Sequence, residues 1–519
     1  MMVSADGKGI GKVIFSSSLG TLIEWYDFYI FGMLAKTISV QFFPEGNDTA
    51  ALLSTLAIFA AGFLVRPFGA LVFGRLGDMI GRKSTFLLTL VLMGGSTFLI
   101  GLVPGYRSIG IVAPLLVLLL RLVQGLALGG EYGGAATYVA EHSPVNKRGY
   151  YTSWIQTTAT LGLFVALGVI MAVKANMSDE SFTAEWGGWR YPFWISILLV
   201  GVSIYIRLRM SESPLYSKLK KEGKVSVNPL KESFGHKANF KMVLLALFGA
   251  VMGQGVIWYT GQFYAQSFLE NTVKIEFMQN REILLWGIGL ATPFFLVFGA
   301  LSDRIGRKWI MLTGMLLGVI FYRPIFRCFI KDTNVKEWMQ QNLTVAVADG
   351  SSRMIIKTDT LVTAAGPIWV NHSTEKMVLD NGAAFTVNRA DTTLAGSVDI
   401  TQADNHPVYT DKVLTTALKW KFILLVFVMI LFVTMAYAPI AAFLVELFPT
   451  KIRYTSMSLP YHIGNGVFGG LVPFIATLLS ASYVNDPLVG LWYPIGIAAL
   501  CFVIGGLYLG NKIDANIND

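Results

Sequence analysis

The 519-residue sequence has few charged residues. Only 14% of its residues are Asp, Glu, Lys or Arg, whereas soluble domains carry about 25%, and so few charges cannot cover a water-facing surface. Apolar residues make up 54% of the chain. They form recurring stretches of about 20 residues, the length that crosses a ~30 Å hydrocarbon core. We therefore interpret the chain as an all-α membrane protein.

Several kinds of chemical site are missing from the sequence. Its two cysteines, Cys328 and Cys501, are far apart and form no metal or redox pattern. There is no recognisable nucleophile–base set and no phosphate-binding P-loop. We therefore predict no enzymatic activity, no ATP drive, no cofactor and no metal site. The net charge of +9 is typical of the positive-inside bias of membrane proteins, so we expect no nucleic-acid partner.

Twelve apolar stretches are long enough to span a membrane. They lie at 13–35, 51–73, 84–104, 111–140, 151–173, 189–209, 241–268, 283–300, 309–328, 420–444, 455–480 and 487–510. The short loops after the even-numbered spans hold sixteen Lys and Arg residues, whereas the opposite short loops hold five, with Arg190 at the start of span six. Because Lys and Arg of short loops mark the cytoplasmic side, we expect both termini in the cytoplasm. The first apolar run contains Glu24 and Asp27, so we expect no cleavable signal peptide in this multi-pass inner (plasma) membrane protein.

The spans divide into two groups of six, separated by the basic stretch Arg207–Lys241. The segments that we predict are an N-terminal six-helix half, a cytoplasmic linker, spans seven to nine, an insert, and spans ten to twelve. They cover residues 1–210, 211–240, 241–328, 329–416 and 417–519, respectively.

The insert between spans nine and ten differs from the rest of the chain. Its net charge is −3, opposite in sign to that of the linker, and the topology places it outside the cell. Leu343–Ala348, Met354–Lys357 and Ala384–Val387 have the composition of short strands, and Asp349-Gly350 and Asn381-Gly382 are turn signals. We therefore expect a small, β-rich extracytoplasmic domain.

One loop sequence occurs twice. Gly74-Arg-Leu-Gly-Asp78-Met-Ile-Gly81-Arg82-Lys83 follows span two, and Gly299-Ala-Leu-Ser-Asp303-Arg-Ile-Gly306-Arg307-Lys308 follows span eight. Glycine permits a tight turn between two helix ends, and the basic pair can bind the carboxylate and the helix termini. We expect both copies to hold the cytoplasmic face closed. The gate residues that we predict here and nearby are Asp78, Arg82, Glu131, Asp303, Arg307, Glu446 and Arg453.

The duplicated loop resembles the signature loop of the major facilitator superfamily. Further motifs are similar to its metabolite:H⁺ symporter family, which contains bacterial transporters of α-ketoglutarate, citrate, shikimate and proline/betaine. These motifs are Leu19–Gly32, Arg66–Gly74, Arg121–Gly134, Trp189–Phe193, Glu212–Pro214, Glu446–Arg453 and Gly464–Gly470. The resemblance covers essentially all twelve spans and omits only the insert. It implies two six-helix halves around a midplane site, alternating access, and transport of a small organic acid or zwitterion.

An acidic pair lies inside the first span. Glu24 and Asp27 are three residues apart and therefore share one helix face. Two carboxylates this close cannot easily both stay ionised in a low dielectric, so one should bind a proton near neutral pH. We predict that Glu24, Asp27 and Arg121 couple transport to protons. The alternative is a structural ion pair with Arg121 or Arg66, and a pair that breaks on protonation would satisfy both interpretations.

Other polar side chains within the spans are candidates for substrate contact. The planar guanidinium of Arg121 suits a carboxylate of either the protein or the substrate. The predicted substrate-binding residues are Arg66, Arg121, Gln124, Tyr259, Gln262, Tyr461 and Asn465. Hydrogen bonds between helices and aromatic packing explain those in spans seven and eleven equally well. His462 is a further candidate for a proton relay.

We predict proton-coupled symport by a monomer in the bilayer, with a small molecule and H⁺ as its partners. One alternative is a uniporter or exchanger without proton coupling, which uptake that survives Glu24→Gln plus Asp27→Asn would favour. A second is a transporter-like receptor whose outer insert binds ligand, which unchanged transport after deletion of 329–416 would contradict. No residue in the sequence identifies the substrate.

Overall fold

The computed structural model describes most of the chain. It covers residues 14, 18, 21–22, 25–80, 82–130, 132–208, 235–340, 345–347, 354–363, 366–394, 400–402, 407–448, 453–483 and 485–510. Glu24, Glu131 and most of the linker 211–240 lie outside these residues, as do the side chains of Asp78 and Arg82.

The contacts divide the chain into two compact units. Unit 1 contains residues 1–264, 287–323 and 427–519, and unit 2 contains residues 265–286 and 324–426. The five-segment division expected from the sequence stays a prediction.

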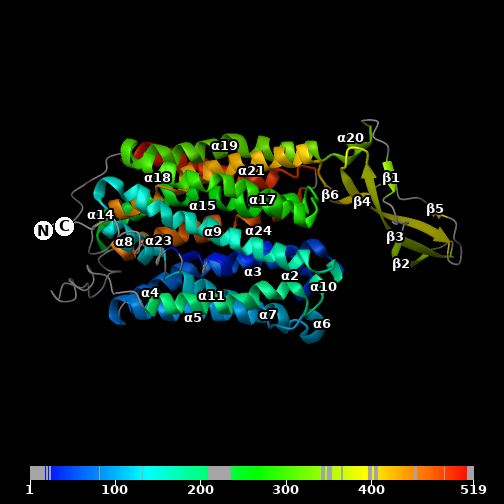
Figure 1. Ribbon diagram of the computed structural model, residues 1–519, viewed down its shortest axis with the longest axis horizontal. Helices are drawn as coiled ribbons and strands as arrows, with labels where there is room; N and C mark the ends of the chain where they lie inside the picture. Colours follow the sequence, from blue (N-terminus) through cyan, green and yellow to red (C-terminus); the bar gives the residue numbers. More distant parts are fainter. Residues whose placement is uncertain are drawn as a thin grey trace. The chain divides into compact units, whose positions relative to one another are not determined.

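The N-terminal part of unit 1 is helical (Figure 1). After the helical residues 25–33, its longer helices are α2 (Ala35–Phe42), α3 (Asp48–Leu64), α4 (Arg66–Ile80), α5 (Arg82–Ile100), α7 (Val112–Leu128), α8 (Tyr132–His142), α9 (Arg148–Ala175) and α11 (Tyr191–Leu208). Short helices between them are α6 (Tyr106–Ile109), η1 (Val145–Lys147), α10 (Asp179–Thr183) and η2 (Gly188–Arg190).

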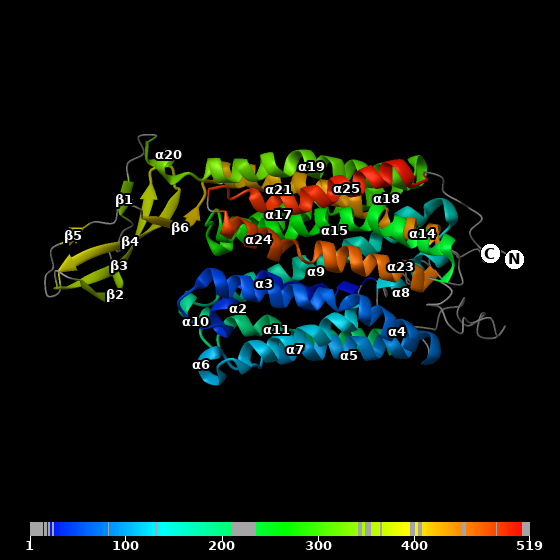
Figure 2. The ribbon, with the colours of Figure 1, turned by 180° about the vertical axis from the view of Figure 1, so that it is seen from behind.

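The C-terminal part of the chain repeats this helical character (Figure 2). Its helices are α14 (Lys237–Ala246), η3 (Leu247–Val251), α15 (Met252–Tyr259), η4 (Thr260–Tyr264), α16 (Ala265–Asn271), α17 (Phe277–Ala291), α18 (Pro293–Ile305), α19 (Arg307–Asp332), α20 (Val335–Gln340), α21 (Thr416–Tyr437), α22 (Ile440–Leu447), α23 (Arg453–His462), η5 (Ile463–Gly469), α24 (Val472–Ser482), η6 (Val489–Leu491) and α25 (Trp492–Tyr508). The π-helical segments η3, η4 and η5 are of interest because π-bulges are frequent at functional sites.

Many of these helices are long and apolar enough to cross a membrane. In the described residues eight continuous helical segments meet that condition, with Leu87–Ile100 and Val112–Leu128 as shorter apolar helices. Each of the twelve stretches expected from the sequence overlaps helical residues. The chain is therefore a helical membrane protein, and the count of twelve spans stays a prediction.

Glycines let the helices of the first half pack closely. A Cβ at Gly125 of α7 would overlap the carbonyl of Gly62 in α3, and one at Gly129 would overlap the carbonyl of Arg66. The spacing of these glycines predicts such contact between helices. The structure confirms that α7 packs backbone to backbone against α3 and α4.

Unit 2 contains a six-stranded antiparallel sheet. Its strands are β1 (Val345–Val347), β2 (Met354–Thr363), β3 (Gly366–Leu379), β4 (Ala384–Leu394), β5 (Ile400–Gln402) and β6 (Val408–Val413). β3 and β4 form a hairpin from Val378↔Ala384 to Ile368↔Leu394, and Gly382 in its turn has φ +84°. The sheet confirms the expected β-rich insert and its Asn381-Gly382 turn, whereas Asp349-Gly350 lies outside the described residues.

The base of this sheet is bonded to neighbouring segments of unit 2. The backbone N–H of Lys412 in β6 donates to Lys274 O (2.9 Å), and Glu276 N–H donates to Lys412 O (3.0 Å). Gln279 makes two hydrogen bonds to the backbone of Leu414. Its Nε2 donates to the Leu414 carbonyl (3.1 Å), and its Oε1 accepts from the Leu414 N–H (2.6 Å). The last strand is therefore held to the segment between α16 and α17.

Candidate functional site

Buried polar atoms without a hydrogen-bond partner gather where helices of the two halves meet. Among the described residues they belong to Asp27, Tyr29, Arg66, Arg121, Gln254, Trp258, Tyr259, Gln262 and His462. These side chains come from residues 25–33, α4, α7, α15, η4 and α23. Because buried polar groups in proteins are normally hydrogen-bonded, such a concentration is typical of a binding or proton-transfer site.

Asp27 is fully buried, and neither carboxylate oxygen has a hydrogen-bond partner in the described structure. Gln124 lies beside it, donating from Nε2 to Thr97 Oγ1 (2.9 Å) and, more weakly, to the Asp27 carbonyl (3.5 Å). Arg121 in turn donates to Gln124 Oε1. Of the predicted coupling residues, Asp27 and Arg121 are thus brought close together, with Gln124 between the aspartate's helix and the arginine.

Arg121 is surrounded by aromatic rings. Its guanidinium carbon lies 4.5 Å from the centre of the Phe31 ring and 5.0 Å from those of Phe28 and Phe59. It makes no ion pair with Asp27 in the described structure, and its other hydrogen bond there is a long one to Phe59 O (3.5 Å). Cation–π contacts and Gln124 therefore hold this buried cation.

Arg66 lines a small cavity of about 30 Å³. Its guanidinium lies over the rings of Phe63 (4.2 Å) and Phe28 (4.9 Å). The other lining residues are Thr21, Trp25, Phe28, Leu128, Tyr132, Ala135, Tyr461 and His462. Arg66 is the one ionised group among these lining residues, in a wall that is otherwise mainly aromatic or apolar.

An aromatic layer lies to one side of this cavity and joins the two halves. Tyr29 stacks on Phe263 (5.1 Å between ring centres), and Phe63 contacts Tyr259 edge to face (5.0 Å). Trp25 lies 5.2 Å from Trp258. Trp25 belongs to this layer and also lines the cavity, so the layer borders the cavity.

Tyrosines of both halves form another wall. The ring of Tyr132 in α8 stacks in parallel on Tyr461 of α23, with 3.5 Å between centres. The Tyr461 hydroxyl is bonded to that of Tyr437 (2.7 Å), and Gln156 donates to the Tyr132 hydroxyl (2.7 Å). These hydroxyls therefore already have partners within the protein.

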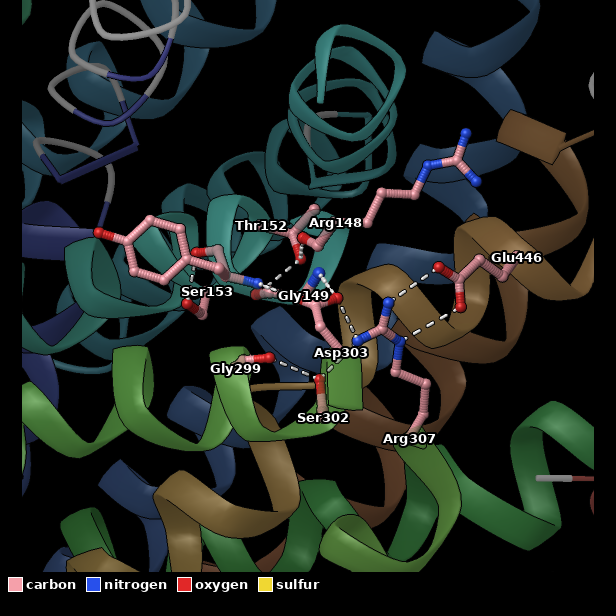
Figure 3. A network of polar contacts seen from close by, with 10 residues as sticks. Arg148, Gly149, Thr152, Ser153, Gly299, Ser302, Asp303, Arg307 and Glu446 are labelled. Carbon is pink, nitrogen blue, oxygen red and sulfur yellow. Dashed lines mark hydrogen bonds and ion pairs between the residues drawn. The ribbon is translucent and has the colours of Figure 1, made fainter. Parts of the chain in front are cut away.

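The second copy of the duplicated loop connects the halves through Asp303 (Figure 3). Its carboxylate accepts hydrogen bonds from the backbone N–H groups of Gly149 (2.8 Å) and Tyr150 (2.9 Å). Because α9 begins at Arg148, these are unpaired donors of its first turn, where the helix dipole also favours an anion. Asp303 thus caps a helix of the other half.

Arg307 binds several groups at the same place (Figure 3). It donates to Ser302 Oγ and Asp303 Oδ1, both at 2.7 Å, and to the two carboxylate oxygens of Glu446 at 3.0 and 3.2 Å. We call Asp303, Arg307, Glu446 and the first turn of α9 the latch. Its charged side chains are almost fully buried, so the bidentate pair is little screened by water.

Two glycines allow the latch to form. A Cβ at Gly299 would lie 2.5 Å from Ser153 Oγ, and one at Gly149 would lie 2.5 Å from Gly299 O. Gly299 therefore serves close approach of α18 to α9, whereas the turn expected from glycine is made by Gly306, with φ +96°.

The remaining residues selected from the sequence lie in different places. Arg453 is buried and donates to Phe448 O (3.1 Å). Asn465 donates to Gln254 Oε1 (3.0 Å), a bond between α15 and η5, while Gln262 and Tyr259 are buried in the second half. Glu24, Glu131 and the side chains of Asp78 and Arg82 lie outside the described part of the chain.

The cavity also contains residues that the sequence did not single out. Trp25 and Tyr132 line it together with His462, which the sequence indicated only as a proton relay. Thr21, Trp25 and Phe28 are spaced i, i+4, i+7, which places them on one helix face. That spacing is a signal that sequence reasoning could have used.

Comparisons with known proteins agree with this architecture. The family model "Sugar (and other) transporter" matches residues 13–224. The inner membrane metabolite transport protein YhjE of Escherichia coli K12 is 32% identical over 480 residues, 91% of this chain and 88% of that protein. The proline/betaine transporter of Salmonella typhimurium is 35% identical over 334 residues, 62% of this chain and 65% of that protein, so this match spans slightly less than two thirds of that relative.

A solved structure shows the same fold. The xylose transporter XylE from E. coli, in a partially occluded inward-open conformation, aligns with a TM-score of 0.62 over 97% of this chain and 98% of that chain, at 14% identity. The protein is a multi-pass membrane transporter and not an enzyme. The chain belongs to the major facilitator superfamily, in its branch of metabolite transporters.

Proposed function

We propose that the protein is a proton-coupled symporter that carries a small organic acid or zwitterion by alternating access. The observation that carries the coupling is Asp27, a fully buried carboxylate with no counter-ion in the described structure. An isolated ionised carboxylate is very unfavourable in a low dielectric. Asp27 therefore carries a proton in this conformation and loses it when its surroundings become hydrated.

Arg121 and Gln124 supply the partner for the deprotonated state. Gln124 already contacts both the Asp27 backbone and Arg121. Once Asp27 is ionised, attraction to the guanidinium favours a rearrangement of this trio, so protonation changes the packing of residues 25–33 against α7. Glu24 is the second proposed coupling residue because it precedes Asp27 by three residues in the sequence, a spacing that places two residues on one face of a helix.

Arg66 is the proposed anchor for the substrate carboxylate. A guanidinium binds a carboxylate with two parallel hydrogen bonds, and the surrounding rings can accept a cationic group by cation–π contact. The name of one relative specifies proline and betaine, and both are zwitterions with a carboxylate. Arg121, Gln124, Tyr259, Gln262, Tyr461 and Asn465 stay proposed contacts.

Substrate binding requires movement of the cavity walls. A cavity of about 30 Å³ has room for only a few water molecules, which is less than a metabolite needs. For the cavity to widen, the rings of the aromatic layer have to separate, and Tyr132 has to move away from Tyr461. We place the latch and both termini in the cytoplasm and the sheet of unit 2 outside the cell. The proposed gate also includes Asp78, Arg82, Glu131 and Arg453. The transporter is proposed to work as a monomer.

The test distinguishes coupling to protons from transport of the substrate itself. Asp27→Asn is reconstituted in vesicles, and uptake driven by a pH gradient is compared with counterflow of the same organic acid or zwitterion. We expect gradient-driven uptake to fall at least ~10-fold while counterflow persists, because a permanent amide imitates the protonated carboxyl but cannot release a proton.

Asp179→Asn is the matched control because it neutralises a carboxylate exposed at the start of α10, and it should leave both activities unchanged. The double variant Glu24→Gln plus Asp27→Asn covers both candidates of span one. Uptake that ignores a protonophore, or that persists in the double variant, would favour a uniporter or exchanger instead.

A further inference from the structure

His462 is a buried polar group that neither the latch nor the proton coupling explains. It is the last residue of α23, immediately before the π-helical segment η5, and it lines the same cavity as Arg66. Its exposed fraction is 2%, and neither ring nitrogen makes a close hydrogen bond among the described residues, although the backbone of Gly129 interacts with the imidazole. Burying such a group without full hydrogen bonding is unfavourable.

The polar neighbours of His462 along the chain form hydrogen bonds with other residues. Tyr461 bonds to Tyr437 and stacks on Tyr132, and its ring meets the imidazole only edge to face. Asn465 donates to Gln254 and to the Tyr461 carbonyl. Of Tyr461, His462 and Asn465, the imidazole of His462 is therefore the group that can form a hydrogen bond with a ligand in the cavity.

Its chemistry differs from that of Arg66. A guanidinium offers only donors, whereas a neutral imidazole offers one N–H donor and one bare nitrogen acceptor. The two nitrogens point away from each other, so one substrate group can reach only one of them. A hydroxyl can pair with either nitrogen, because it can accept from the N–H or donate to the bare nitrogen. A ketone or carboxylate oxygen can only accept, an ammonium can only donate, and a methylated ammonium does neither.

We infer that His462 is the specificity-determining residue for a hydroxyl group that the substrate carries within a few bonds of its carboxylate. The preferred class is hydroxy-carboxylates over their deoxy counterparts. This inference rests on the proposed function, because it assumes that the carboxylate binds Arg66. A site built to bond a substrate hydroxyl discriminates strongly against the analogue without it, because the polar group is then left unpaired.

Binding in detergent tests this without any proton gradient. Purified full-length protein is titrated with three pairs of probes that differ by one hydroxyl: malate and succinate, carnitine and γ-butyrobetaine, and 4-hydroxyproline and proline. Quenching of tryptophan fluorescence reports binding, since Trp25 lines the cavity. We expect at least one pair to bind, with the hydroxylated member at least ~10-fold tighter.

Two variants assign the preference to the imidazole. His462→Phe removes both polar atoms and should weaken only the hydroxylated member, so that the ratio within the pair falls to about one. His462→Gln retains a donor and an acceptor and should keep much of the ratio. If His462→Phe does not fold, as judged by size-exclusion chromatography, His462→Leu replaces it.

The outcomes separate the inference from the proposal on which it rests. If none of the six probes binds, or if Arg66→Gln leaves their binding unchanged, the proposed carboxylate site is wrong. If probes bind through Arg66 without preference for the hydroxyl, or if His462→Phe weakens both members equally, the role of His462 is purely structural and the inference is overturned.

Discussion

Lys412 is a partly buried cation at the base of the sheet in unit 2. Its Nζ donates to Thr333 O (2.9 Å). Burial, together with the positive charge of Lys274, lowers the pKa of Lys412 from 10.5 to about 8. Between pH 8 and 10.5 the folded state therefore binds fewer protons at this site than the unfolded state. The free energy of unfolding of unit 2 should rise with pH in this window, whereas below pH 8 the residue contributes a constant penalty.

This pH dependence can be removed by one substitution. Lys412→Met abolishes the titration, so we expect the rise in unfolding temperature between pH 8 and about 10 to disappear in differential scanning calorimetry. Lys336→Met, which replaces an exposed lysine of α20, should keep the rise. An identical pH profile in wild type and Lys412→Met would contradict the assignment.

At the residue scale, neighbours within a helix could be predicted from the sequence but partners between helices could not. Arg121 and Gln124 are three residues apart, which predicts a shared face, and the structure joins them by a hydrogen bond. Whether Asp27 meets Arg66 or Arg121 depends on how three separate helices pack. The answer, with Gln124 between Asp27 and Arg121, follows from close contact of α7 with its neighbours at Gly125 and Gly129.

At the scale of elements, the contact between α9 and α18 depends on the absence of side chains at Gly149 and Gly299. Gly149→Ala places a methyl group against Gly299 O and Arg307. Such overpacking costs about 1–3 kcal/mol, and it destabilises only the state in which the two helices touch. We therefore expect this end of the bundle to open more often.

A cysteine at Thr137 reports the opening. Thr137 of α8 is buried against Met457 of α23, so Thr137→Cys reacts with a maleimide only after the halves separate, in a background with Cys328 and Cys501 replaced by alanine. Labelling should be about 10-fold faster with Gly149→Ala. Gly168→Ala, on the same helix but with open space around its Cβ, should leave the rate unchanged. Equal rates in all three proteins would rule out a role for this contact in closure.

Some elements follow from the sequence and others depend on tertiary packing. The stretches Met354–Lys357 and Ala384–Val387 lie in β2 and β4, although both strands extend further. The central strand β3 was missed because Asn371–Lys376 is a polar run, and strand formation there depends on pairing with β2 and β4 on either side. The π-helical segments had no sequence signal either; one of them, η5, contains Gly464, whose backbone closely approaches Gly255 of α15.

At the scale of the whole molecule, the groups proposed for transport all belong to unit 1. Asp27, Arg66, His462 and the latch lie there, whereas the sheet belongs to unit 2. Replacing residues 342–413 by a short Gly/Ser linker should therefore leave counterflow within about twofold of wild type, provided that the protein inserts normally. Loss of counterflow by an inserted protein would favour the receptor-like alternative, in which the insert binds ligand.

That experiment needs a control that weakens the attachment of the sheet without removing the sheet. Gln279→Ala retains the insert but removes both side-chain bonds to Leu414. If the deletion and Gln279→Ala impair counterflow equally, the loss comes from loosening of the segment before α17. If only the deletion does so, the sheet itself is required.

At this scale the membrane class could be predicted from the composition of the chain, and the two related halves could be predicted from the repeated loop. The first copy of that loop, around Asp78 and Arg82, lies where side chains are not described, so its part in closure stays a prediction. The substrate could not be predicted, because the cavity combines Arg66, Trp25, Tyr132 and Tyr461 from four separate helical segments.

The latch has a consequence for the timing of transport. A single guanidinium, that of Arg307, holds Ser302, Asp303 and Glu446 together, and a partial displacement would leave carboxylates buried without a counter-charge. We therefore expect intermediate openings to be scarcely populated and this end of the protein to pass between closed and open in discrete jumps. If the latch gates transport as proposed, the turnover rate is set by how long the protein stays in the closed state and hardly by how fast the helices move once released.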